Sequence, residues 1–167
     1  MVVFEPYQGE NGNTVERIMV EKRDDGDVFT ALTVYGKKGS HQHIFQALDP
    51  DKTFTTSSAS FRGYYGVVGF EGTEFTSIYL GKGTEISMNG YFLKSSIPDG
   101  SANLYLYEGD IKISCNQPTE IGFPVKGKVK RITLLQGSTR KELLFNIDNK
   151  IIYVSVPAIE NGLVLTE

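Results

Sequence analysis

Hydrophobic and polar residues alternate with a period of two along most of the chain. Each run ends at Gly, Asn, Asp, Pro or Ser, which is the pattern of short strands joined by turns. The predicted strands are Thr14–Lys22, Asp27–Tyr35, Gln42–Leu48, Tyr65–Phe70, Phe75–Leu80, Thr84–Met88, Tyr91–Ser95, Asn103–Tyr107, Asp110–Cys115, Glu120–Pro124, Lys128–Leu135, Lys141–Ile147, Ile151–Val156 and Leu163–Thr166. The pattern therefore predicts an all-β protein.

Short connections between these strands predict antiparallel hairpins. Asn89-Gly90 is the strongest signal, because both residues tolerate the positive φ of a type I′ turn. Gly81-Lys82-Gly83 indicates a further turn or a bulge, and 49–63 is expected to be a long loop or a crossover between sheets. The segment 138–144 could form a helix, but a strand fits better because it leads straight into the Asp148-Asn149 turn.

Many short strands at spacings near ten residues favour two packed antiparallel sheets. A jelly-roll is the leading variant of this β-sandwich, and a closed β-barrel is the alternative. A chain of 167 residues is long enough for one well-buried core, so residues 1–167 are expected to form a single domain.

Charge and hydropathy narrow the range of partners. The formal net charge of -3 offers no excess of cations for phosphates, so nucleic acid is not expected. No stretch has the length of apolar sequence needed to cross a bilayer, and the first thirty residues carry too many charges for a signal peptide. Neither a membrane nor a leader within this chain is expected.

Well-marked catalytic motifs are absent from the sequence. It contains no Gly-x-Ser-x-Gly, His-Glu-x-x-His, Cys-x-x-Cys or Walker sequence, so no catalytic residue is assigned. His41 and His43 fall on one face of a strand, but two ligands do not make a metal site, and an exposed polar face is the simpler interpretation. Cys115 alternates with isoleucines and is expected to be buried.

Aromatic residues suggest a binding site. Arg62, Tyr64 and Tyr65 combine a fork-shaped cation with two rings at the end of the predicted loop. Tyr105 and Tyr107 alternate with leucines, so their rings should point away from the core. Aromatic faces stack on the C–H patches of sugars, and Arg binds carboxylates with two parallel hydrogen bonds, so these five residues are the candidate carbohydrate ligands. A purely structural role in the sheets is the competing interpretation.

The stretch Gly63–Val125, with Tyr64-Tyr65-Gly66, Phe75–Gly83 and Ala102–Tyr107, resembles the C-terminal β-sandwich regions of bacterial polysaccharide lyases of the heparinase II/III type. His43–Pro50 is similar to a strand and loop of those regions, and Val129–Pro157 to terminal domains of glycoside hydrolases. The resemblance implies a non-catalytic accessory or carbohydrate-binding module of a longer, extracellular or periplasmic enzyme.

The implied partners are a polysaccharide or oligosaccharide and the neighbouring domains of that enzyme. By the same analogy a structural calcium ion is conceivable at Asp24-Asp25-Gly26-Asp27, but this stretch does not match a defined calcium loop, so no cofactor or metal is assigned. Two alternatives stay open: a phage-like or virion-like assembly protein, and a small polysaccharide lyase or hydrolase.

Overall fold

The computed structural model describes residues 15–23, 28–125 and 127–167. These residues form β-strands joined by turns, with a single 3₁₀ turn, η1 (Lys37–Gly39), and no α-helix among them. The strands are β1 (Val15–Arg23), β2 (Phe29–Gly36), β3 (Ser40–Ala47), β4 (Phe54–Thr55), β5 (Ala59–Glu71), β6 (Glu74–Met88), β7 (Tyr91–Ser95), β8 (Ala102–Tyr107), β9 (Asp110–Cys115), β10 (Thr119–Pro124), β11 (Ile132–Gln136), β12 (Thr139–Leu143), β13 (Phe145–Asp148), β14 (Ile151–Val156) and β15 (Ile159–Thr166).

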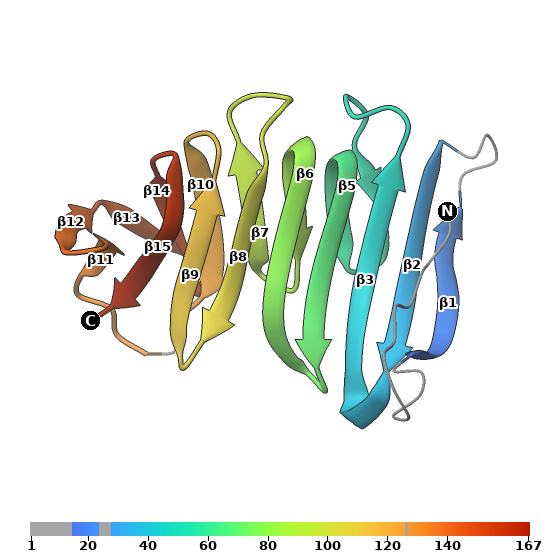
Figure 1. The fold of residues 1–167 in the computed structure, drawn as a ribbon, viewed down its shortest axis with the longest axis horizontal. Coiled ribbons are helices and arrows are strands. Elements are labelled where there is room, and N and C mark those ends of the chain that lie inside the picture. Colours follow the sequence, from blue (N-terminus) through green and yellow to red (C-terminus); the bar gives the residue numbers. More distant parts are fainter. Residues whose placement is uncertain (1–14, 24–27, 126) are drawn as a thin grey trace.

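The strands make two layers packed face to face (Figure 1). The front layer has the order β1-β2-β3-β5-β6-β8-β9-β15-β11-β12, and β7, β10, β14 and β13 lie behind it. Every described strand pair is antiparallel, and the terminal strands β1 and β12 do not pair with each other, so the sheet is not closed into a barrel. The predicted β-sandwich is confirmed.

Two long strands belong to both layers. In the front layer, the second half of β5 pairs with the first half of β6. In the back layer, the first half of β5 pairs with the second half of β6, which also pairs with β7. The passage between layers coincides with a bulge in which Arg62 opposes Glu85 while Gly63 opposes Gly83. A Cβ on Gly83 would lie only 2.6 Å from the Cα of Gly63, so this close approach of two backbones requires glycine.

The core fills the space between the layers. Alternation along the strands directs one side chain in two inward, and the inward positions form continuous rows across neighbouring strands. The front row contains Val68, Ile78, Leu104 and Ile113, and the back row contains Phe61, Ile86, Leu93 and Ile121, all with an exposed fraction of 0%. Burying each such side chain contributes about 1.5–3 kcal/mol, so these rows are a main source of stability.

Several sequence-based boundaries were wrong. The segment 49–63 is not a continuous loop, since it contains β4 and the start of β5, but it does connect the front layer to the back layer, as the alternative of a crossover predicted. Of the two alternatives predicted for Gly81-Lys82-Gly83, the turn was wrong and the bulge is confirmed: β6 continues through these residues, and its pairing with β5 shifts register beside Gly83. The predicted strand Lys141–Ile147 divides into β12 and β13, because the chain leaves β11 in front to pair with β14 behind. The predicted strand Lys128–Leu135 begins only at Ile132.

Other local expectations were correct. Asn89 and Gly90 have φ values of 52° and 84° and connect β6 to β7 in a tight hairpin, as a type I′ turn requires. The segment that could have been a helix forms β12, a strand paired with β11. The strand is favoured over a helix there because Leu143 is buried between the layers while the residues before it in β12 stay exposed.

Candidate functional site

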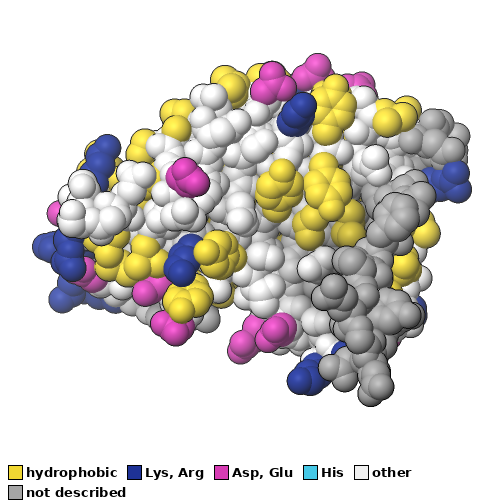
Figure 2. Space-filling model, viewed as in Figure 1, with side chains coloured by type: hydrophobic (Ala, Val, Ile, Leu, Met, Phe, Trp, Pro, Cys, Tyr) yellow, Lys and Arg dark blue, Asp and Glu magenta, His cyan; other side chains and the backbone are white. Residues whose placement is uncertain are grey.

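Four tyrosines lie on the outer face of the front layer. Tyr65, Tyr79, Tyr105 and Tyr107 alternate with core residues on β5, β6 and β8, so the pleat directs their rings away from the core. Tyr65, Tyr79 and Tyr107 have exposed fractions of 41%, 37% and 47%. We call these four residues the tyrosine row. Figure 2 shows hydrophobic side chains, a class that includes Tyr, gathered over the middle of this face.

Tyr65 and Tyr79 form a pair across β5 and β6. Their ring centroids are 6.0 Å apart at an angle of 60°, which is an edge-to-face contact. The ring of Tyr79 covers Gly81, where a Cβ would approach it to 2.9 Å. Partial burial and the neighbouring Tyr79 raise the pKa of Tyr65, so its phenol stays neutral and available as a hydrogen-bond donor.

Tyr105 and Tyr107 lie close to a cation. The Nζ of Lys112 is 3.5 Å from the ring centroid of Tyr107 and 5.9 Å from that of Tyr105. Tyr105 opposes Ser77 while Tyr79 opposes Asn103, so Tyr79 and Tyr105 are diagonal neighbours, about 7–8 Å apart. The tyrosine row is therefore continuous over three adjacent strands and ends at a positive charge.

The structure separates the five predicted ligands. Tyr65, Tyr105 and Tyr107 share the front face, whereas Arg62 lies beyond the bulge on the outer face of the back layer. Arg62 is opposed there by Glu85, and its Nη2 lies 3.9 Å from a carboxylate oxygen of Asp51. Tyr64 lies at the bend itself and is 46% exposed. Neither residue belongs to the tyrosine row.

A shallow groove of about 540 Å³ borders Tyr79. Its lining residues come from β6, β8, β9, β11 and β15 and from the connections beside them, and its polar members are Ser101, Asn103, Ser114, Asn116, Gln136 and Glu160. Alternation could have identified Tyr79, which stands between the core residues Ile78 and Leu80. The groove itself had no signal in the sequence, because its residues are scattered between Tyr79 and Glu160.

His41 and His43 share one strand face, as alternation predicts, but this is the inward face rather than an exposed one. His41 stacks on Phe70 at 5.2 Å between ring centroids, and its ring lies 5.3 Å from that of His43. The Nδ1 of His43 is 3.2 Å from the carboxylate of Glu21 and 2.9 Å from the hydroxyl of Thr33. Burial lowers the pKa of His43, in spite of the opposing effect of Glu21.

Other kinds of site find little support. Within the described ranges no group of three or more His, Cys, Asp and Glu side chains is arranged to hold a metal ion. Asp24-Asp25-Gly26-Asp27, the conceivable calcium turn, lies outside the described residues. In the part of the chain that the structure describes, no helix is long and apolar enough to cross a membrane.

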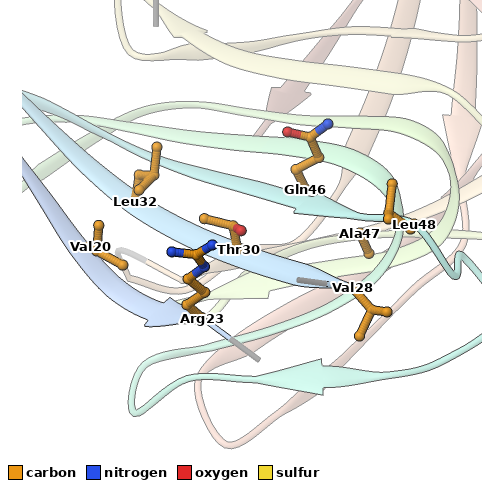
Figure 3. Close-up of a pocket in the computed structure, with 8 residues that line it drawn as sticks. All are labelled: Val20, Arg23, Val28, Thr30, Leu32, Gln46, Ala47 and Leu48. Atoms are coloured by element: carbon orange, nitrogen blue, oxygen red, sulfur yellow. The ribbon is translucent and has the colours of Figure 1, made fainter. Parts of the chain in front are cut away.

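A second hollow, of about 450 Å³, lies on β1, β2 and β3 (Figure 3). Figure 3 shows Arg23 of β1 beside Thr30 of β2, with apolar side chains around them. The lining residues are Val20, Arg23, Val28, Thr30, Leu32, Gln46, Ala47 and Leu48. None of these eight described residues is aromatic, so they offer no flat faces like those of the tyrosine row.

Comparison with protein families identifies the family to which the chain belongs. Residues 18–106 match the family model of the endo-acting ulvan lyase C-terminal domain, and this span covers more than half of the chain and holds the whole tyrosine row except for Tyr107. No curated protein matches the chain significantly. The match confirms the resemblance to a C-terminal domain of a polysaccharide lyase, while the family is that of ulvan lyases rather than the heparinase II/III type. The chain belongs to the endo-acting ulvan lyase C-terminal domain family.

Proposed function

We propose that this chain is a non-catalytic accessory module of a polysaccharide-degrading enzyme and that it binds polysaccharide on the outer face of its front layer. The observation that carries the proposal is the tyrosine row, four outward rings on adjacent strands ending at Lys112. Rings held on a sheet present flat apolar faces of fixed orientation, which suit the C–H patches of successive sugars.

Ulvan is the first candidate ligand, because the matching family is named for a lyase that acts on it. Lys112 adds a cation beside Tyr107 that would attract an anionic group on such a chain. The module would work outside the cytoplasm, joined to the other domains of a longer enzyme. A catalytic role is not part of the proposal, since His41 stacks on Phe70 and His43 meets the same ring edge-to-face on the inward face, away from the tyrosine row.

Affinity electrophoresis of the purified chain through gels containing ulvan tests the proposal. Tyr65→Ala and Tyr79→Ala should each weaken binding roughly fivefold, because a ring contact contributes about 1 kcal/mol. Tyr153→Ala is the matched control, since this half-buried tyrosine lies on the outer face of the back layer beside Phe92. Arg62→Ala and Tyr64→Ala test the two predicted residues that lie elsewhere.

Two results would contradict the proposal. Absence of retardation of the folded parent chain by ulvan, by uronate polysaccharides and by neutral polysaccharides alike would exclude a binding module and favour a supporting role between domains. Retardation that Tyr153→Ala reduces as much as Tyr79→Ala would show that the tyrosine row is not the binding face.

A further inference from the structure

The groove beside Tyr79 continues the tyrosine row with polar side chains. Tyr79 of β6 opposes Asn103 of β8, and Asn103 opposes Ser114 of β9, so the three residues lie in one line across the sheet. Directly opposed side chains in an antiparallel sheet have Cβ atoms about 4.5–5.5 Å apart. A ring, an amide and a hydroxyl therefore follow one another along the floor of the groove.

Hydrogen bonds to the backbone hold several of these polar groups in place. The Ser114 hydroxyl accepts from the N–H of Asn161 at 3.0 Å, and the Ser101 hydroxyl accepts from the N–H of Lys82 at 3.2 Å. Asn116 accepts from the N–H of Ser101 at 2.8 Å. Each serine hydroxyl acts only as an acceptor in these bonds, so its own proton can still be donated to a ligand.

The charge in the groove selects against anions. Among the described residues that line it there is no Lys or Arg, and the charged one is Glu160, which is exposed. Like charges repel, so a carboxylate or sulfate would be disfavoured beside Glu160. Lys112, a cation on the front face, lies instead beside Tyr105 and Tyr107. Neutral hydroxyl groups suit the amide and hydroxyl side chains best.

We propose that this groove is a neutral-sugar subsite, in which Asn103 and Ser114 bind the hydroxyls of an uncharged sugar that stacks on Tyr79. The inference rests on the proposed function and adds a division of the face, with uncharged sugar in the groove and anionic sugar at Lys112. From Tyr79 on β6 to Gln136 on β11 the groove crosses four strand intervals, about 19 Å at 4.7–4.9 Å each, which gives room for more than one sugar unit.

Affinity electrophoresis in ulvan gels at about 0.1 M and about 1 M salt tests the subsite, because the Debye length falls from about 10 Å to about 3 Å over this range. Asn103→Ala and Ser114→Ala should each weaken binding roughly three- to tenfold, by the same factor at both salt concentrations, because hydrogen bonds between neutral groups are not screened. Lys112→Ala should weaken binding more at low salt than at high salt. Ser155→Ala, an exposed serine on β14 of the back layer, is the matched control.

The outcomes separate this inference from the proposed function. If the parent chain is not retarded, the binding role itself fails. If the parent is retarded and Tyr79→Ala weakens binding while Asn103→Ala and Ser114→Ala match Ser155→Ala, the module binds without this subsite and the inference is overturned. If the loss in Asn103→Ala disappears at high salt, the groove binds a charged group and the inference is again overturned. Equal thermal unfolding curves establish that the variants are folded.

Discussion

Substitution of Gly83 tests the bend that carries β5 and β6 from one layer to the other. A Cβ at this position would lie 2.5 Å from the carbonyl oxygen of Arg62, 2.6 Å from the Cα of Gly63 and 2.9 Å from the Cδ1 of Leu80. Two of these three atoms belong to the backbone of the paired strand, so no side-chain rotation can relieve the contact. Gly83→Ala must instead push β5 and β6 apart.

The size of the effect follows from these distances. Ordinary contacts of a Cβ begin at 3.4 Å, so the strands must separate by up to about 0.9 Å (3.4 less 2.5) at the bulge. Over-packing of this kind costs about 1–3 kcal/mol, and the movement also strains the bond from the Gly83 N–H to the Gly100 carbonyl, 2.9 Å long. We expect a loss of about 3 kcal/mol, which lowers the melting temperature by roughly 6–12 °C.

Urea and thermal unfolding followed by circular dichroism measure this loss. Gly72→Asn is the control: Gly72 has a φ of 60°, which Asn tolerates, and a Cβ there meets none of the described residues within 4 Å. The control should change the free energy of unfolding by less than about 0.5 kcal/mol. A Gly83→Ala variant as stable as Gly72→Asn would refute the reasoning, because it would mean that the bend does not depend on the close approach of two glycines.

Three further predictions concern titration and packing. The pKa of His43 is lowered in the folded state, so at a pH near the ordinary histidine pKa of 6.5 the unfolded chain binds more protons than the folded chain. The free energy of unfolding should therefore fall as the pH drops below about 6.5. Urea unfolding of His43→Gln should lack this part of the pH dependence. Burial raises the pKa of the Cys115 thiol, which donates a hydrogen bond to the carbonyl of Pro157 at 3.2 Å. A thiol reagent should therefore modify Cys115 only when the protein unfolds, and rapid reaction of the native protein would contradict the burial of this thiol. Leu93→Ala should lower the free energy of urea unfolding by about 2–5 kcal/mol, since Leu93 has an exposed fraction of 0%; a loss below about 1 kcal/mol would mean that the layers repack around the cavity.

The local sequence pattern was sufficient to predict the fold class and, for many residues, the face of the sheet on which the side chain lies. Period-two alternation predicted that Tyr105 and Tyr107 point away from the core, and the structure places both on the outer face. The positive φ that Asn89 and Gly90 tolerate predicted their hairpin. These features depend on neighbours within a few residues, which a single sequence displays.

Which residues come together in the candidate site depended on the pairing of strands far apart in the sequence. Arg62, Tyr64 and Tyr65 are consecutive or nearly so in the sequence, yet the bulge at Gly63 and Gly83 places Arg62 on the back layer and Tyr65 on the front. Tyr65 instead contacts Tyr79, because β5 and β6 pair with each other. Sequence proximity does not determine shared location where a strand passes from one layer to the other.

An all-β chain with outward aromatic rings could therefore be predicted from local strand and turn preferences. The inward position of His41 and His43 depends on the three-dimensional fold, and so does the groove that Asn103, Ser114 and Glu160 border with Tyr79. The physical reason is that strand register and the packing of one layer on another arise from contacts between residues far apart in the chain, and these contacts have no local signature.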